Sequence, residues 1–437
     1  MAEIIAIRGR RVWDSRGNPT VEAEVALAGG VLGRAIAPSG ASRGTREALE
    51  LRDGGDRLRG KDVQAAVAHV GGPIAAALLG WEASDQAGVD AALIALDPSP
   101  LKATIGGNAT VAVSLAVLHA AAAAAGKPLW RHVADHYGRV PSLPLPEIQI
   151  FGGGAHAGRR VDIQDFMVMV PGATSFDEVM ELTSGVYFAA GELMARKGRL
   201  AGVADEGGWW PEFSSNEEAL ETLTEAIHRS GETPGKRVVI SLDIAASEFG
   251  DGAAGGRYRL ALDQTERDTG GMIDMLGRWI DAYPIVSIED PLAENDPDGM
   301  RAFTARFGAR LQIIGDDYLV TNARLVEAAV TDQACNAVLI KVNQAGTVSE
   351  AVETFTVAEQ AGWSAVVSAR SGETEDVSIS HLAVGLGAGQ LKVGSFTRSE
   401  RMAKWNECLR IGSALPADAF VGGGPLAATW WGAAARR

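Results

Sequence analysis

Six short apolar runs in the second half of the chain each end in or carry a charged residue, and they recur at a nearly even spacing. Those residues are Asp243, Glu289, Asp316, Lys341, Arg370 and Lys392. Subtracting successive positions gives gaps of 46, 27, 25, 29 and 22 residues. After the first, each gap fits one strand, one helix and their loops, a pattern that predicts a parallel sheet. If these units close into a barrel, three carboxylates and three cations meet at one mouth, which suits a metal ion and an anionic ligand.

Length and charge limit the classes of protein to which the chain can belong. At 437 residues it exceeds one ordinary core, so two domains are expected. The net charge of -15 argues against a nucleic-acid partner, which needs a basic surface, although a local group of cations can still bind an anion. Two cysteines form no disulfide framework, and the first residues, MAEIIAIRGR, contain no apolar signal segment. We therefore expect a cytoplasmic protein.

One apolar stretch raises the question of a membrane span. Residues 109–125 are mostly alanine and valine, but Thr110, Ser114 and His119 interrupt them. The stretch falls short of a spanning helix, so we expect a buried helix and no membrane partner.

Residues 1–138 are expected to form a separate N-terminal α+β domain. The alternating segments VEAEVALAGG and VLGRAIAP predict an antiparallel hairpin with Gly29 and Gly30 at its turn. The segment PSGASRG, residues 38–44, has the composition of a mobile loop. Prolines at positions 141, 144 and 146 mark the junction, and residues 139–437 are expected to form the α/β barrel.

The acids at the strand ends are candidate metal ligands. Asp243, Glu289 and Asp316 offer the oxygen donors that Mg²⁺ prefers. Alternatively, each acid caps a helix at a strand–helix turn, which would explain any one of the three.

Lys341 and Glu206 are candidate proton-transfer groups. Lys341 lies inside the apolar strand LIKV and must point to the barrel mouth or carry a desolvation cost. Near Mg²⁺ and Lys392 its pKa should fall, giving a neutral amine that can abstract a proton. The alternative is a lysine that pairs with and supports an acid. Glu206 lies in the glycine-rich segment VADEGGWWP, although most acids in such segments only form turns.

Several longer motifs together resemble one family. They are VWDSRGNPTVEAEV, PSGAS, EALELRDG, DEGG, SIEDPLAE, IGDD, LIKVNQ, RSGETED and RSERMAKWN. From about residue 3 to residue 412 the chain closely resembles enolase (phosphopyruvate hydratase), with the motifs in that family's order. The resemblance implies an N-terminal α+β domain packed over an eight-stranded α/β barrel, a homodimer, and removal of water from 2-phosphoglycerate.

The resemblance also implies a role for each matching residue. Lys341 would take the proton next to the carboxylate, and Glu206 would protonate the departing hydroxide. Asp165 would be a further catalytic residue, since it matches an important carboxylate of the family. Asp243, Glu289 and Asp316 would hold one Mg²⁺, and Ser42 would help to hold a second. The residues implied at the substrate are Gln164, His156, Arg370, Ser371 and Lys392.

Departures from the family pattern cluster at the substrate. The usual SHRSGE contains Ala369 in place of histidine, the usual IQEFM contains Asp165 in place of glutamate, and the usual NGG begins with Gly152. These changes remove side-chain volume at the substrate. By contrast, Arg43, which replaces a threonine in the loop, and Arg159 add long, positively charged side chains.

The departures favour a specialised paralogue acting on a 2-phosphoglycerate analogue with a larger anionic head group. An example is carboxyphosphonoenolpyruvate synthase of phosphonate natural-product pathways, whose substrate carries an extra carboxyl on phosphorus. Two alternatives remain: an ordinary glycolytic enolase, and a non-catalytic binding or scaffold protein with this fold.

Overall fold

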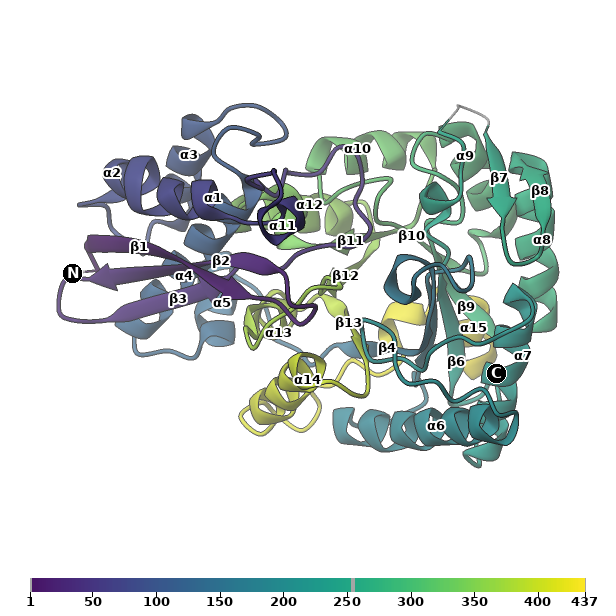
Figure 1. Ribbon diagram of the computed structural model, residues 1–437. Coiled ribbons are helices and arrows are strands. Elements are labelled where there is room, and N and C mark those ends of the chain that lie inside the picture. The colour runs from purple at the N-terminus through teal and green to yellow at the C-terminus, as the bar shows by residue number, and fades with distance from the viewer. Residues whose placement is uncertain (1, 253–255, 437) are drawn as a thin grey trace.

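The chain forms an N-terminal α+β domain that lies beside an eight-stranded α/β barrel (Figure 1). The structure is a computed structural model that describes residues 2–252 and 256–436. The N-terminal sheet has the order β1 (Ile4–Trp13), β2 (Pro19–Leu27), β3 (Leu32–Ile36), and all its pairs are antiparallel. The predicted hairpin is confirmed: Gly29 and Gly30 at its turn have φ values of 95° and 85°, which glycine adopts at little cost.

Helices complete the N-terminal domain. They are α1 (Gln64–His69), α2 (Ala75–Leu78), α3 (Gln86–Leu96), α4 (Gly107–Ala124) and α5 (Leu129–Tyr137). Helix α4 is long and apolar enough to cross a membrane, but 83% of it is buried inside the domain, as predicted for the 109–125 segment. Its small side chains let it approach the sheet closely: a Cβ on Gly33 of β3 would lie only 2.2 Å from the carbonyl oxygen of Ala116.

The barrel closes through eight buried strands. They are β4 (Leu145–Gly152), β5 (Asp165–Met169), β6 (Val239–Asp243), β9 (Ile285–Glu289), β10 (Gln312–Gly315), β11 (Ala337–Ile340), β12 (Ser364–Ser368) and β13 (Gly389–Ser395). The predicted alternation of strand and helix holds from β9 onward. The longer first gap holds a hairpin of β7 (Arg257–Leu260) and β8 (Thr265–Asp268).

The parallel pairing predicted for the six charged runs is confirmed for β6 and for β9 to β13, but a strand outside those runs departs from it. β5 runs antiparallel to both of its neighbours, β4 and β6. Between β4 and β5 the chain forms only a short 3₁₀ helix at Gly154–Ala157. Because no long helix carries the chain back along the outside of the barrel, β5 must return in the opposite direction.

Helices surround the barrel, along its outside and at its two ends. They are α6 (Phe176–Arg196), α7 (Asn216–Arg229), α8 (Thr269–Ala282), α9 (Pro297–Phe307), α10 (Ala323–Asp332), α11 (Val342–Ala345), α12 (Val348–Gln360), α13 (Ser378–Leu386), α14 (Ser399–Gly412) and α15 (Trp430–Ala435). Side-chain caps such as Ser175 for α6 and Thr347 for α12 fix where these helices begin.

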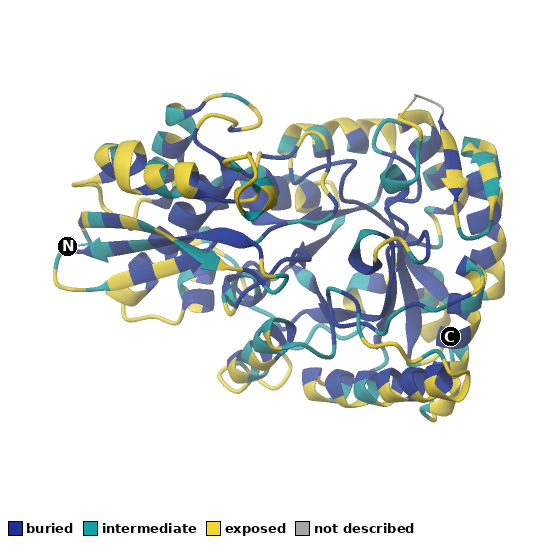
Figure 2. Ribbon diagram, in the orientation of Figure 1, coloured by how far each residue is buried: buried dark blue, intermediate teal, exposed yellow. Residues whose placement is uncertain are grey.

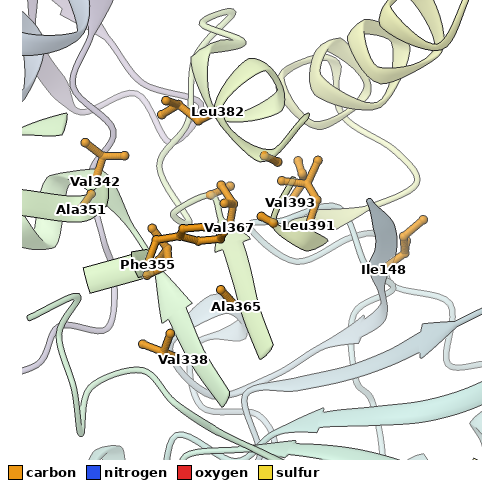
Figure 3. Close-up of a cluster of buried hydrophobic side chains, with 14 of the residues drawn as sticks. Ile148, Val338, Val342, Ala351, Phe355, Ala365, Val367, Leu382, Leu391 and Val393 are labelled. Carbon is orange, nitrogen blue, oxygen red and sulfur yellow. The ribbon is translucent and has the colours of Figure 1, made fainter. Parts of the chain in front are cut away.

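The main core lies between the barrel strands and these helices. The strands are buried, whereas the helices alternate between buried and exposed positions (Figure 2). In one part of this core, Phe355 of α12 lies near Val367 of β12 and Val338 of β11 (Figure 3). This packing holds the strands in a fixed register, so the side chains at their ends have fixed positions.

Candidate active site

Residues at the strand ends meet at one mouth of the barrel. Asp243 and Glu289 are the last residues of β6 and β9, and the register pairs them with each other. Asp165 is the first residue of β5 and pairs with Asp243. The reversed direction of β5 therefore brings the beginning of that strand to the same mouth as the ends of its neighbours.

Lys392 lies at the centre of three of these carboxylates. Its Nζ atom is 2.7 Å from Glu289 Oε2, 2.9 Å from Asp243 Oδ2 and 3.4 Å from Asp165 Oδ2. Burial lowers the pKa of Lys392, but the surrounding carboxylates outweigh burial and raise its pKa well above the usual value. The lysine is therefore charged and held by Asp243 and Glu289, two of the acids predicted to bind metal, and by Asp165.

Lys341 follows β11 and donates a hydrogen bond to Asp316, which follows β10. Gln344 donates to the other oxygen of Asp316 at 2.9 Å. Burial lowers the pKa of Lys341, but the adjacent Asp316 carboxylate outweighs it, so the pKa is raised. The protein's own side chains therefore do not lower the pKa of Lys341, because attraction to Asp316 exceeds the repulsion from Arg370 and Lys392. The fall beside a bound Mg²⁺ stays a prediction.

The carboxylates of Asp243, Glu289 and Asp316 have the chemistry to hold a divalent cation. Glu289 Oε1 is buried and has no hydrogen-bond partner among residues 2–252 and 256–436. Burial and the neighbouring Asp243 raise the pKa of Glu289 well above its usual value. A buried carboxylate oxygen that lacks a partner, next to two further carboxylates, is the donor set that Mg²⁺ takes.

Two tighter groups within the described residues could also hold a metal ion. One consists of His156, Asp165 and Glu206, and the other of Asp290, Asp316 and Asp317. Asp290, which the sequence interpretation missed, accepts hydrogen bonds from the backbone N–H groups of Asp316 at 3.0 Å and Asp317 at 2.7 Å. It therefore fixes the turn that presents Asp316.

His156, Asp165 and Glu206 form a second group of side chains at the mouth, and Asp165 connects it to Lys392. His156 Nδ1 lies 3.0 Å from Asp165 Oδ1, and its Nε2 lies 3.8 Å from Glu206 Oε1. Burial lowers the pKa of His156, but Glu206 and Asp165 outweigh burial and raise it to about 9. Burial raises the pKa of Asp165, but His156 and Lys392 outweigh burial and hold it well below its usual value.

Two glutamines position acids at the barrel mouth. Gln164 Nε2 donates to Asp243 Oδ2 at 3.0 Å. Gln149, which the sequence interpretation missed, donates to Asp165 Oδ1 at 2.5 Å and lies 3.4 Å from Glu206 Oε2. Its own oxygen accepts from the N–H of Gly208 at 2.9 Å, so one uncharged side chain connects β4, β5 and the DEGG loop.

The PSGASRG loop covers the mouth and is held by the end of β12. Arg370 binds Glu47 at 2.7 Å and the carbonyl oxygen of Ser42 at 2.9 Å. The N–H of Ala41 donates to Ser371 Oγ at 2.7 Å. A Cβ on Gly40 would lie 1.9 Å from Arg370, so glycine is needed there. Glu47 was not predicted, because only the packing of the two domains brings it to Arg370.

These groups enclose a cavity of about 20 Å³, room for about one water molecule. Most of the predicted site residues line it: Ser42, His156, Gln164, Asp165, Glu206, Asp243, Lys341, Arg370, Ser371 and Lys392. Glu289 and Asp316 do not line it but contact its two lysines. Arg43 is exposed and faces a second cavity outside the loop. Ala369 lines the inner cavity, where the family usually has an imidazole.

Comparison with known proteins matches both domains of the structure. Residues 4–133 match the family described as "Enolase, N-terminal domain", and residues 140–428 match "Enolase, C-terminal TIM barrel domain". The chain belongs to the enolase family. A relative named enolase, from Rubrobacter xylanophilus, is 47% identical over 416 residues, which is 95% of this chain and 96% of the relative.

Family membership confirms the predicted fold and makes the chain a hydro-lyase. The expectation of an enzyme is therefore confirmed, and a purely non-catalytic scaffold is the weakest of the three interpretations.

Proposed function

We propose that this hydro-lyase removes water from 2-phosphoglycerate to give phosphoenolpyruvate. The observation that carries the proposal is the inner cavity, where Lys341, Arg370 and Lys392 lie with Asp165, Glu206 and His156. Such an arrangement offers cations for an anionic substrate, and groups that can exchange a proton with it. The 47% identity to a relative named enolase, over nearly the full length of both chains, supports this ordinary substrate over the modified one.

Elimination requires one proton to leave carbon and another to reach the departing oxygen. Lys341 would take the proton next to the substrate carboxylate, because its amine lines the cavity. Glu206 would then protonate the departing hydroxide, so that water leaves as the carbon–carbon double bond forms. His156 lies within 4 Å of both Asp165 and Glu206. His156 and Asp165 would therefore hold Glu206 and the leaving group in place.

The remaining residues would bind the substrate's anionic ends. Arg370 and Ser371 would hold the phosphoryl group, Lys392 the carboxylate, and Gln164 the middle of the substrate. Because the enclosed volume is only about 20 Å³, the PSGASRG loop has to move before a substrate enters.

Mg²⁺ would be held by Asp243, Glu289 and Asp316, and a second ion would be held with the help of Ser42. A bound divalent cation supplies positive charge where negative charge develops on the substrate carboxylate. Asp243, Glu289 and Asp316 also bind Lys392 and Lys341, so both lysines would be available to the substrate when these acids serve as metal ligands.

Further expectations from the sequence remain part of this proposal. They are a boundary between residues 138 and 139, a homodimer or larger homo-oligomer, a small anionic substrate and a cytoplasmic location. Family membership supports the small anionic substrate.

A second candidate substrate has a larger anionic head group, such as the carboxyphosphono analogue that gives carboxyphosphonoenolpyruvate. Ala369 presents only a methyl group to the inner cavity, and Arg43 lines the larger cavity outside the loop. A competition assay with both substrates in the same reaction, followed by ³¹P NMR, compares the rates at which they are consumed. We expect 2-phosphoglycerate to be consumed first, and faster use of the analogue would reverse the order of the two candidates.

A further inference from the structure

A cavity of about 700 Å³ lies outside the loop that closes the inner site. Six of the side chains that line it are cations, namely Arg16, Arg43, Arg52, Arg59, Lys61 and Arg159. Only three lining residues are acids. The cavity is therefore positive in a chain whose net charge is -15.

Two of the three acids already have partners. Arg52 lies 2.6 Å from Glu50, and Arg159 lies 2.8 Å from Glu248.

Three of the cations have no such partner. Arg43, Arg59 and Lys61 have no carboxylate within 4 Å in the part of the chain that the structure describes, and Arg59 instead donates to the neutral Asn18 at 3.2 Å. Positive charge therefore exceeds what the protein itself neutralises here.

The pKa of Lys61 reflects the cations around it. Burial lowers this pKa first, and the neighbouring Arg16, Arg59 and Arg52 lower it further. Mutually repelling cations at the edge of a cavity are stabilised by a bound anion.

The outer cavity adjoins the loop directly. Gly40 and Ala41 line the outer cavity, whereas Ser42 lines the inner one. Arg16 connects the two: it donates to the carbonyl oxygen of Ser39 at 2.9 Å and to Ser371 Oγ at 3.2 Å. An anion in the outer cavity therefore lies against the same loop segment that has to move for the inner site to open.

We propose that the outer cavity is an anion-binding vestibule, which captures small phosphorylated carboxylic acids before the loop admits them to the inner site. A cleft lined by one sign of charge raises the local concentration of an oppositely charged ligand and its association rate. The natural ligand rests on the proposed function, but the anion site itself does not.

Binding of inorganic pyrophosphate without added metal tests the site independently of turnover. Isothermal titration at low ionic strength would compare the parent with the double variant Arg59→Gln/Lys61→Gln. The matched control is Lys236→Gln/Arg324→Gln, which removes the same charge from residues that do not line the vestibule. We expect the first variant to lose one class of pyrophosphate site, or to bind at least about tenfold more weakly, whereas the control binds like the parent.

Equal binding by all three proteins would overturn the proposal. Arg43→Gln provides an independent variant if the double variant loses its native circular dichroism, and it should weaken the same class of site. Turnover then tests capture: kcat/KM should fall in Arg59→Gln/Lys61→Gln at low ionic strength and approach that of the control at high salt. Weaker binding with unchanged kcat/KM would contradict capture, while a chain that fails to turn over 2-phosphoglycerate would still give the binding result.

Discussion

Replacing Gln149 with leucine should separate the two proton transfers of the proposed reaction. The Gln149 side chain is fully buried, and its amide donates to Asp165 and lies near Glu206 on the proposed acid side. Lys341 lies on the other side, where it binds Asp316. Leucine has a similar volume but neither a hydrogen-bond donor nor an acceptor. The substitution should therefore free Asp165 and Glu206 on the acid side and leave Lys341, the base, in place.

The energetic cost follows from the bonds that are lost. A hydrogen bond to a charged group contributes about 1.5–3 kcal/mol, and an unpaired buried donor costs about 1–3 kcal/mol. Gln149→Leu loses the bond to Asp165 and leaves the N–H of Gly208 unpaired, so we expect about 2.5–6 kcal/mol of destabilisation. Gln149→Glu retains an acceptor for Gly208 but places a third carboxylate beside Asp165, and serves as the second variant.

The assay compares two rates on 2-phosphoglycerate in D₂O with Mg²⁺. Deuterium incorporation next to the carboxylate reports proton removal, and ultraviolet absorbance of the product reports loss of water. In both variants we expect incorporation to persist while dehydration falls by about 10²–10⁴-fold, the usual contribution of a positioned acid. A urea titration confirms that each variant is folded under assay conditions. An equal fall in both rates in folded protein, or unchanged dehydration, would show that Gln149 does not support the acid side of the reaction.

Three further predictions concern the same cavity. Lys341→Ala should abolish turnover and retain Mg²⁺ binding, measured by calorimetry, because Asp316 loses a competing cation; retained turnover would rule out Lys341 as the base. Ala369→His combined with Asp165→Glu should raise kcat/KM for 2-phosphoglycerate if these differences from the usual family sequence limit that reaction, and no gain would show that other positions set the preference. The pKa of His156 is about 9 in the folded chain against about 6.5 unfolded, so its contribution to stability is complete below pH 6.5 and is lost as the pH rises through 9. Between pH 6.5 and well above pH 9, the unfolding free energy should therefore fall by on the order of 3 kcal/mol less in His156→Asn than in the parent, as measured by urea titration. Parallel curves of unfolding free energy against pH for the two proteins would contradict a charged His156.

The even spacing of the strand ends was enough to predict the barrel and to place charged groups at one mouth. It could not predict the direction of β5, because a five-residue apolar strand is the same in either direction. The signal that could have indicated the reversal is the glycine-rich segment between β4 and β5, which contains no pattern for a long helix.

The missed residues act through contacts that sequence patterns do not contain. Glu47 lies 323 positions from Arg370, and only the packing of the two domains brings them together. Gln149 is an uncharged residue in a buried strand that also contains Glu147, so the only signal was a pair of polar side chains within a buried strand. The sequence also did not reveal that Asp316 raises the pKa of Lys341, because the spacing of charges gives their number but not the contact between these two side chains.

Steady-state turnover of 2-phosphoglycerate with Mg²⁺ decides whether the protein catalyses the proposed reaction. The proposed function predicts an enolpyruvate product, seen by ultraviolet absorbance, at a rate of about 10 per second or more, and no product from Lys341→Ala. A rate that is absent or orders of magnitude lower, in protein that is folded and binds Mg²⁺, would contradict it and shift the assignment to a substrate with a larger anionic head group.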